Sequence, residues 1–502
     1  MFEAAELRRS IPKDEYELAL PEIRSRLLAA QRALRTTKHS VIVIVSGVEG
    51  AGKSEVVNRL HEWLDARGIS AHAFWRDSDE ERERPRYWRF WRTLPPRGTI
   101  GILFGSWYTQ PIVDRVFKRS SKADFDRELQ RITFFEHMLA QDGSLILKLW
   151  LHLPKEVEDE RLIEKSKRKK SNSIYGPDAK QYAKQYERFA TVSERAIRMT
   201  DTAEAPWRII EATDARYRDL TVARMVLEAL EDLVTIKESK QAPTVVVAHA
   251  DEEAALTSPG QTVLDRVDVT KTADPDKYGK QLSKLQSNLG SLAWKAWNQQ
   301  RSTVIIFEGW DAGGKGGAIR RVIAPVDARL YRVISVAAPT DEERAQHYLW
   351  RFWRQIPRAG HMTIYDRSWY GRVLVERVEK FAKVDEWSRA YREINDFEEQ
   401  LVERGIILMK FWLHIDQDEQ LRRFKERQEI AYKQHKITEE DWRNREKWLP
   451  YNSAVHDMVS RTSCALTPWT LIPANDKRYA RLEVVRTVAN RLEEALSGKN
   501  GH

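Results

Sequence analysis

Two stretches decide the fold of this chain: VIVIVSGVEGAGKSEVV at residues 41–57 and TVIIFEGWDAGGKGGAIRRV at residues 303–322. In each stretch a run of β-branched residues leads into a glycine-rich turn, a lysine and a helical pattern. Glycines let several backbone N–H groups converge on one anion, the helix start adds partial positive charge, and the lysine adds a full charge. This order predicts a Walker A phosphate-binding loop, and it occurs twice.

The two loops belong to an internal repeat with a constant offset of 262 residues, the separation of Gly47 from Gly309. Because the offset stays unchanged over most of each half, there is almost no net insertion between the copies. Both halves are therefore predicted to share one fold. The matched pairs include Trp88 and Trp350, Trp91 and Trp353, Trp107 and Trp369, Lys148 and Lys410, His152 and His414, Trp207 and Trp469, and Asp214 and Asp476.

Short apolar runs alternate with long charged segments of helical period in each half, which predicts an α/β fold. We expect two tandem P-loop kinase-like domains, each a parallel sheet flanked by helices with a helical lid. The first domain is expected at residues 1–236 and the second at 276–498, joined by a linker at 237–275 with one short strand. Strands are expected at residues 41–46, 70–74, 99–103, 145–151 and 207–212, and at 303–307, 332–338, 362–365, 406–413 and 469–474.

Charge and cysteine content narrow the class of partner and the compartment. The chain has 84 Lys and Arg against 75 Asp and Glu, a formal net charge of +9. This balance favours a polyanionic partner, such as polyphosphate, nucleotides or nucleic acid. The single cysteine, Cys464, cannot form an internal disulfide, no signal-peptide pattern follows Met1, and no apolar run approaches about 18 residues. We therefore expect a cytoplasmic protein without a membrane partner.

The two loops differ in a way that misleads simple pattern matching. Residues Gly47–Ser54 satisfy G-x-x-x-x-G-K-[ST] in full, where the Ser54 hydroxyl is a candidate Mg²⁺ ligand. The second loop lacks that hydroxyl but carries Asp311 inside the turn, where the first has Glu49. The residues predicted to bind phosphate in the second loop are Gly309, Gly313, Gly314, Lys315, Gly316 and Gly317.

A larger difference follows the third predicted strand of each half. The second half reads TIYDRSWYGRVLVERV at residues 363–378, and the first reads GILFGSWYTQPIVDRV at 101–116. A carboxylate at the end of a central strand is typical of a Walker B metal ligand, and clustered arginines neutralise phosphoryl oxygens. The shared Ser-Trp-Tyr is interpreted mainly as packing. Only the second half keeps the charges, so it is predicted to be catalytic: Asp366 stands opposite Phe104, Arg367 opposite Gly105, and Arg372 opposite Gln110.

A charged helical segment at residues 419–437 places Arg423 and Arg427 one turn apart on one face. It is interpreted either as a solvated basic face or as a lid whose arginines close on phosphates. The first half keeps Arg161 opposite Arg423 but has Lys165 opposite Arg427. Clusters of Trp and Arg occur in both halves, which favours core and subunit contacts over base stacking, and we expect a homo-oligomer.

The second half resembles the polyphosphate kinase 2 family over nearly its whole length. The resemblance rests on the Asp-Arg pair before SWY, the GWDAGGKGG loop and TPWTLIPANDKRYARL at residues 467–482. The fused two-copy arrangement resembles the polyphosphate:AMP phosphotransferase class of that family, in which the second unit is catalytic. The resemblance implies Mg²⁺ as cofactor and phosphate transfer between inorganic polyphosphate and a nucleotide.

The resemblance also implies roles for individual residues. Trp310 stands where an arginine is expected in single-unit members, so nucleotide preference does not transfer from them. The implied catalytic residues are Asp311, Lys315, Asp366, Arg367, Arg372, Arg423 and Arg427, with Asp311 and Asp366 as metal ligands and Asp311, Arg367 and Glu376 as acceptor contacts.

The expected reaction is in-line attack by an AMP phosphate oxygen on the terminal phosphorus of polyphosphate, giving ADP. Two alternatives remain open. One is an ATP-dependent nucleotide kinase, because a P-loop does not identify its phosphate donor. The other is a non-catalytic binder of polyanions or nucleic acid, which would not require the carboxylate and arginine set.

Overall fold

The computed structural model describes residues 1–167, 184–235, 262–430 and 439–497, and it contains two compact units. Unit 1 is built from Met1–Asp77, Arg89–Thr244 and Thr340–Trp350. Unit 2 is built from Ser78–Trp88, Val245–Pro339 and Arg351–His502. Each unit therefore includes a short segment from the other sequence half, and the two segments are related by the 262-residue offset. The short strand expected in the linker lies outside the described residues.

Unit 1 contains a five-stranded parallel sheet of order β2-β3-β1-β4-β5. Its strands are β1 (Ser40–Gly47), β2 (Ile69–Ala73), β3 (Ile100–Phe104), β4 (Ser144–His152) and β5 (Trp207–Glu211). The helices of the first sequence half are η1 (Phe2–Ala5), α1 (Lys13–Leu34), α2 (Lys53–Trp63), η2 (Ala66–Gly68), α3 (Asp79–Arg82), α4 (Trp88–Trp91), α5 (Thr109–Val116), α6 (Lys122–Gln141), α7 (Lys155–Lys167), α9 (Tyr186–Thr200) and α10 (Ala215–Thr235).

Unit 2 repeats this sheet in the order β10-β9-β6-β8-β7. Its strands are β6 (Thr303–Gly309), β7 (Tyr331–Ser335), β8 (Met362–Asp366), β9 (Ile407–His414) and β10 (Trp469–Pro473). The helices of the second half are η3 (Val263–Arg266), α12 (Pro275–Asn298), α13 (Lys315–Ile323), α14 (Asp341–Arg344), α15 (Trp350–Trp353), η4 (Trp369–Arg372), α16 (Val375–Val378), α17 (Val384–Glu403), α18 (Gln417–Glu429), α19 (Glu439–Glu446), α20 (Trp448–Thr462) and α21 (Lys477–Leu496).

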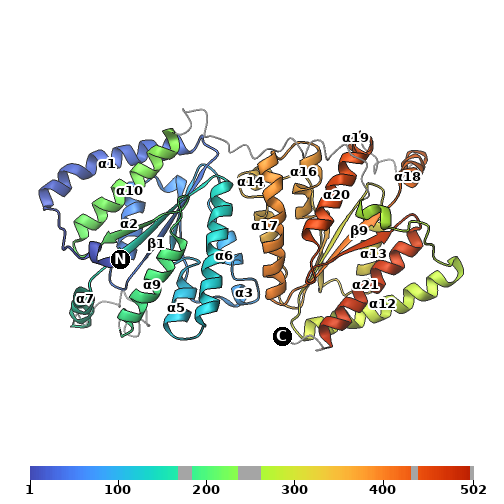
Figure 1. Ribbon diagram of the computed structural model, residues 1–502, viewed down its shortest axis with the longest axis horizontal. Helices are drawn as coiled ribbons and strands as arrows, with labels where there is room; N and C mark the ends of the chain where they lie inside the picture. The colour runs from blue at the N-terminus through green and yellow to red at the C-terminus, as the bar shows by residue number, and fades with distance from the viewer. Residues whose placement is uncertain (168–183, 236–261, 431–438, 498–502) are drawn as a thin grey trace. The chain divides into compact units, whose positions relative to one another are not determined.

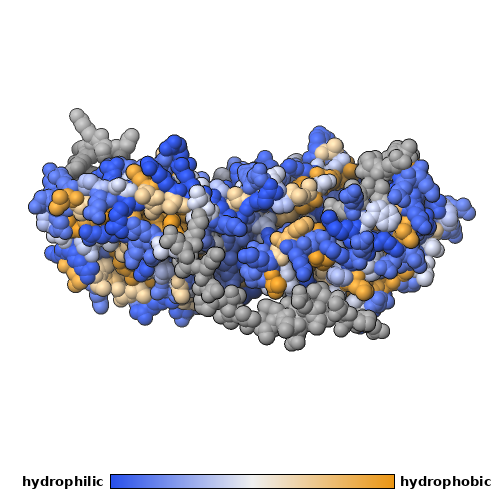
Figure 2. All heavy atoms as spheres, turned by 90° about the horizontal axis from the view of Figure 1, so that it is seen from above, coloured by the Kyte–Doolittle hydropathy of each residue, from blue (hydrophilic) through white to orange (hydrophobic). Residues whose placement is uncertain are grey.

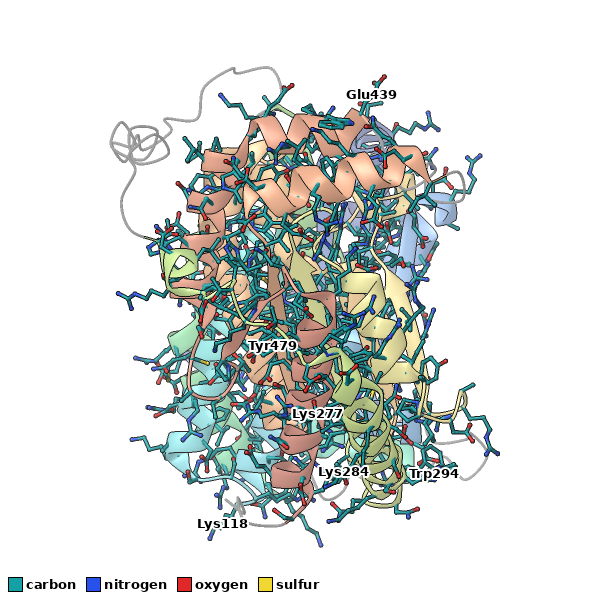
Figure 3. The ribbon with its side chains drawn as sticks, turned by 90° about the vertical axis from the view of Figure 1, so that its right-hand side faces the viewer. Lys118, Lys277, Lys284, Trp294, Glu439 and Tyr479 are labelled. Carbon is teal, nitrogen blue, oxygen red and sulfur yellow. The ribbon has the colours of Figure 1, made fainter. Side chains whose placement is uncertain are left out.

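The predicted α/β fold is confirmed, and each of the ten predicted strands overlaps an observed one, although the strand predicted at 332–338 ends at Ser335. The central strands form because their apolar, β-branched runs are buried on both faces, as in sheets covered by helices on each side. Figure 1 shows helices on both faces of each sheet. Helices α12 and α21 run side by side along unit 2, with Lys277, Lys284 and Trp294 on α12 and Tyr479 on α21 (Figure 3).

The Ser-Trp-Tyr motif belongs to a buried network that both units share. In unit 2, the Trp369 indole and the Tyr370 hydroxyl donate to the Glu398 carboxylate over 3.1 and 2.6 Å. Lys410 donates to the other oxygen of the same carboxylate over 2.7 Å. Unit 1 repeats these contacts with Trp107, Tyr108, Glu136 and Lys148. A buried ion pair needs such hydrogen bonds to offset the cost of desolvation. The Trp and Tyr of the motif supply them, which agrees with the interpretation of this motif as a packing element.

Most of the surface in Figure 2 is hydrophilic, with small hydrophobic groups scattered across it. In the part of the chain that the structure describes, no helix combines the length and the apolar character that crossing a membrane requires.

Candidate active site

The glycine loop of unit 2 connects β6 to α13 and has the geometry that the sequence predicts. Gly309 has φ +150°, and a Cβ there would lie 2.5 Å from the Leu413 carbonyl oxygen, so no larger residue fits. Gly314 has φ +104° and is the N-cap of α13. The Lys315 ammonium donates to the carbonyls of Gly309 and Trp310 over 2.6 and 3.2 Å. The lysine therefore lies against the loop whose N–H groups can bind an anion.

The structure brings Asp311 and Arg367 into contact at this loop. The Arg367 guanidinium lies 3.1 Å from Asp311 Oδ1, and the Asn444 amide donates to Asp311 Oδ2 over 2.9 Å. Gln420 donates to the backbone carbonyl of Asp311 over 3.2 Å. Asp366 ends β8, level with Phe307 on β6, so it lies at the same carboxyl edge of the sheet as the loop. Four of the predicted residues thus gather at one edge of the sheet: Asp311, Lys315, Asp366 and Arg367.

Arg367 has a left-handed backbone conformation, φ +64°. Its counterpart in unit 1, Gly105, has φ +74°, so the backbone shape is common to both units. A non-glycine residue there costs roughly 1–3 kcal/mol. Ala312 repeats the pattern with φ +61°, opposite Gly50 with φ +78°. Unit 2 therefore retains two strained residues beside its phosphate loop, which is a mark of a functional site.

The next predicted residues, Arg372 and Glu376, form an ion pair of 3.2 Å that links η4 to α16. Burial raises the pKa of the Glu376 carboxyl, while the positive charge of Arg372 lowers it. The pair lies just after the strand end that carries Asp366 and Arg367, so Arg372 is held within the same part of unit 2.

Arg423 is buried and anchors the loop. Its guanidinium donates to the carbonyls of Ala312, Ala474 and Asn475 over 2.8, 2.6 and 2.9 Å. Unit 1 repeats this arrangement, with Arg161 donating to Gly50, Ala212 and Thr213. Because both units keep the contacts, they belong to the shared fold. Arg427 lies one turn further along α18 and is half-buried.

Glu308, like Asn444 and Gln420, lies near the loop and was not identified from the sequence. Glu308, directly before Gly309, is buried and accepts a hydrogen bond from Ser368 over 2.8 Å. Burial raises its pKa, against the lowering effects of that hydrogen bond and of Lys315 and Arg367. A charged residue at the end of an apolar strand was the available signal.

Trp310 takes part in an aromatic cluster that closes one side of the loop. Its ring stacks on Trp448 with a centroid distance of 3.7 Å and an interplanar angle of 8°. Its indole N–H donates to His414 Nδ1 over 3.2 Å. Burial lowers the pKa of His414 to about 4, which keeps this nitrogen an acceptor at neutral pH. The tryptophan at the position expected to be arginine is therefore a packed residue.

The acidic residues at this edge fit a magnesium ion that arrives with phosphate. Among the described residues, no group of three or more His, Cys, Asp or Glu side chains is arranged to hold a metal ion. Mg²⁺ is commonly held by one or two carboxylates, with substrate phosphates and waters completing its coordination. Asp311 and Asp366 supply that number of carboxylates beside the phosphate loop.

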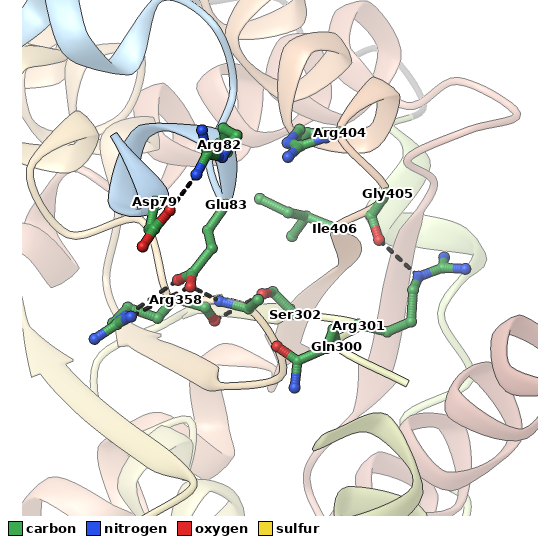
Figure 4. Close-up of a pocket in the computed structure, with 11 residues that line it drawn as sticks. Asp79, Arg82, Glu83, Gln300, Arg301, Ser302, Arg358, Arg404, Gly405 and Ile406 are labelled. Atoms are coloured by element: carbon green, nitrogen blue, oxygen red, sulfur yellow. Dashed lines mark hydrogen bonds and ion pairs between the residues drawn. The ribbon is translucent and has the colours of Figure 1, made fainter. Parts of the chain in front are cut away.

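A cavity of about 580 Å³ lies at the opposite edge of the unit 2 sheet from the glycine loop. Figure 4 shows it with Ser302 and Ile406, which precede β6 and β9, among its lining residues. Arg358 binds the Glu83 carboxylate there over 3.1 and 3.2 Å. Because it lies at the amino ends of the strands, this cavity is separate from the glycine loop.

A parallel sheet whose central strand enters a lysine-containing glycine loop, with a carboxylate ending the adjacent strand, defines a P-loop phosphate-transferring protein. The family model for polyphosphate kinase 2 matches residues 10–268 and 272–500. This chain belongs to the polyphosphate kinase 2 family, and it contains two copies of the family domain.

Similar proteins extend over the whole chain. A polyphosphate:AMP phosphotransferase from Pseudomonas aeruginosa is 49% identical over 499 residues, which is 99% of each chain. One from Acinetobacter johnsonii is 36% identical over 483 residues, or 93% of this chain and 95% of that protein. A solved structure of a polyphosphate kinase 2 from Pseudomonas aeruginosa PA01 covers 100% of both chains with 47% identity and a TM-score of 0.88.

Proposed function

We propose that this chain transfers the terminal phosphate of inorganic polyphosphate to AMP and so produces ADP. The observation that carries the proposal is the charged set at the loop of unit 2, where Asp311 pairs with Arg367 over 3.1 Å beside Lys315. Unit 1 has the loop without that set. Relatives named polyphosphate:AMP phosphotransferase, similar over their whole length, support the choice of substrates.

The proposed mechanism relies on positioning and charge. The loop N–H groups and Lys315 bind the end of the polyphosphate chain, and Arg367 neutralises charge that develops on the transferred phosphoryl group. Arg372, held by Glu376, and Arg427 add positive charge around the same phosphates. An AMP phosphate oxygen attacks in line, the bond to the shortened polyphosphate breaks, and the transferred group forms the β-phosphate of ADP.

We further propose that Asp311 and Asp366 hold Mg²⁺, which when bound screens the negative charge of the phosphates. Release of Asp311 from Arg367 would free both groups for these roles. Arg423 is assigned a positioning role, because its donors already bind the carbonyls of Ala312 in the loop and of Ala474, directly after β10. A cytoplasmic location and a homo-oligomeric state are part of the same proposal.

The test is an assay of ADP formation from AMP with either polyphosphate or ATP as donor. Lys315→Ala and Asp366→Asn are expected to lower kcat with polyphosphate by roughly 10²–10³, the scale of a lost transition-state contact. Lys53→Ala, the matched change in unit 1, is expected to leave the rate largely unchanged. Efficient transfer from ATP but not from polyphosphate would identify a nucleotide kinase instead. Loss of activity in Lys53→Ala alone would place the chemistry in unit 1.

A further inference from the structure

Unit 1 has a cavity of about 310 Å³ at its own glycine loop. It lies between the loop and the carboxyl ends of β2, β3 and β4, the location of the candidate active site in unit 2. Its volume falls within the range of roughly 300–1,000 Å³ that is usual for small-molecule sites. Unit 1 therefore keeps a cavity at its loop although it has Phe104, Gly105 and Gln110 in place of Asp366, Arg367 and Arg372.

The walls of this cavity are rich in aromatic residues, and three of these have no aromatic counterpart in unit 2. The rings that line it include Phe74, Trp75, Phe104, Trp150, Tyr186 and Phe189. At three of the matching positions unit 2 has Val336, Ala337 and Asp366. Trp75 is 55% exposed and Phe104 is half-buried, so parts of these rings are available to a ligand. Aromatic faces beside a small cavity favour a flat, unsaturated ring.

The loop can accept a single anionic group. Helix α2 begins at Lys53, and the Lys53 ammonium donates to the carbonyls of Gly47 and Val48 over 3.1 and 2.9 Å. Glu49 lies 3.3 Å from the same ammonium and already offsets part of its charge. With Gly105 and Gln110 in place of Arg367 and Arg372, the cavity lacks the two arginines that follow the third strand in unit 2, and Arg76 is the arginine among its lining residues.

A buried acid supplies a hydrogen-bonding group to the same cavity. Glu158 on α7 lines it and is 3% exposed, and its Oε2 has no hydrogen-bond partner among the described residues. Its counterpart in unit 2, Gln420, uses its amide to bind the loop carbonyl of Asp311. Burial, reinforced by the negative charge of Glu49, raises the pKa of Glu158 to about 7. The carboxyl is then largely neutral at mildly acidic pH and can donate as well as accept.

We infer that this unit 1 cavity is a second, non-catalytic site that binds a nucleoside monophosphate. The phosphate lies on the Gly47–Lys53 loop, the base lies against the aromatic rings, and Glu158 hydrogen-bonds a polar edge of the ligand. The ligand differs from polyphosphate in having one anionic group and a planar ring. The aromatic substitutions and the lost arginines both favour that choice, and neither would help a chain of phosphates to bind.

The experiment measures hydrogen–deuterium exchange of the full chain with AMP, GMP, ribose 5-phosphate or tripolyphosphate. Peptides covering residues 47–57 and 104–113 report on unit 1 alone, so binding at the catalytic unit does not obscure the result. We expect AMP or GMP to slow exchange in these peptides. Ribose 5-phosphate and tripolyphosphate at the same concentration are expected to have little effect, because neither carries an aromatic ring.

Two variants test the contacts. Val113→Trp fills the cavity from α5, and Lys53→Ala removes the charge at the loop without adding bulk. Lys53→Ala is expected to weaken AMP protection about 10- to 100-fold, the scale of a charged hydrogen bond, and Val113→Trp should abolish it. Turnover by unit 2 and the unfolding temperature report whether each variant folds. If one variant does not fold, the other still tests the contact.

The inference is overturned if neither nucleotide protects the unit 1 peptides of the wild-type chain. It is also overturned if tripolyphosphate or ribose 5-phosphate protects them as well as AMP does, since either result would identify a simple anion site. Protection by AMP that persists in both variants would place the nucleotide elsewhere. The ADP assay on the same samples is a separate readout, so this inference and the proposed reaction can fail independently.

Discussion

The glycine loops of the two units have nearly the same backbone conformation but different residues around them. In unit 1, Gly105 and Gly50 occupy left-handed conformations at little energetic cost. In unit 2, Arg367 and Ala312 occupy the same conformations under strain. The more complete Walker A match belongs to the relaxed unit. The comparison teaches that a loop pattern reports the capacity to bind an anion, whereas strained residues beside it indicate chemistry.

The features that both units keep teach the complementary lesson. Each has a buried lysine paired with a glutamate, and each has an arginine that ties the loop to the neighbouring strand end. These groups look catalytic by residue type, since they are charged and mostly buried. Their presence in a unit without the acid and arginine set indicates that they maintain the fold.

The sharpest way to break the comparison is Arg367→Gly, which gives unit 2 the residue of unit 1. We expect kcat with AMP and polyphosphate to fall by roughly 10²–10³, because a group that neutralises developing charge is lost. The unfolding temperature is expected to stay the same or rise, because glycine relieves the strain at φ +64°.

The matched control is Gly105→Ala in unit 1. A Cβ there would lie 2.8 Å from the Phe74 carbonyl oxygen, in a conformation with φ +74°. We expect a lower unfolding temperature with the turnover of unit 2 retained. An Arg367→Gly variant that keeps full activity would contradict the role assigned to the Arg367 guanidinium.

Acidification is expected to destabilise unit 2 through His414. Its pKa is lowered to about 4 by burial, from an ordinary value near 6.5. Above pH 6.5 the imidazole is neutral in both states. Between pH 6.5 and 4 the unfolded chain binds the proton first, so stability falls by up to about 3 kcal/mol and then levels off.

His414→Asn keeps an acceptor for the Trp310 indole but cannot titrate in this range. Hydrogen exchange of β6 and β9 peptides between pH 7 and pH 4, corrected for intrinsic exchange rates, measures the difference. The wild-type peptides should lose more protection than those of the variant. Equal losses in the two proteins would show that other groups dominate the acid response.

The paired substitutions Arg161→Ala and Arg423→Ala sharpen the distinction between fold and chemistry. Each leaves three backbone carbonyls without a donor, at a cost of about 1–3 kcal/mol. We expect similar losses of protection in the β1 and β6 peptides of the respective units. Only Arg423→Ala should also lower turnover, because its loop carries Lys315. A loss of turnover without any loss of protection would instead support a direct catalytic role for Arg423.

The smallest effect is expected from Trp448→Tyr, which installs the residue found at Tyr186 in unit 1. The stack on Trp310 is then smaller, and an aromatic pair contributes roughly 0.5–1.5 kcal/mol beyond its buried area. Thermal unfolding should detect a shift of a few degrees at most. An unchanged unfolding temperature would mean that this stack adds little to the stability of the loop.

Much of the fold was predictable because the signals are local. Each central strand is an apolar run, each loop follows its strand directly, and Asp366 and Arg367 stand out against Phe104 and Gly105 at the fixed offset. The role of Arg423 was less accessible. Helical spacing puts it on the same face as Arg427, but which one is buried depends on the Ala474 carbonyl, 51 residues away.

Residues 78–88 belong to unit 2 and residues 340–350 to unit 1, and this exchange also could not be predicted from the sequence. Their short helices α3 and α14 are predictable from local capping boxes, Ser78 with Glu81 and Thr340 with Glu343. The capping boxes contain no information about which core each segment joins. Nothing in the predicted limits of 1–236 and 276–498 indicates the exchange.

The sequence by itself determined that this protein is a duplicated P-loop chain and that only one copy keeps an acid and arginine set. Hydrophobic periodicity and residue spacing suffice for that, because strands, loops and repeats are written in neighbouring residues. Only the tertiary structure decided that Arg367 is strained and paired with Asp311, that Arg423 holds the loop, and that Glu158 lines an aromatic cavity. Those properties depend on burial and on carbonyls and charges brought together from distant parts of the chain.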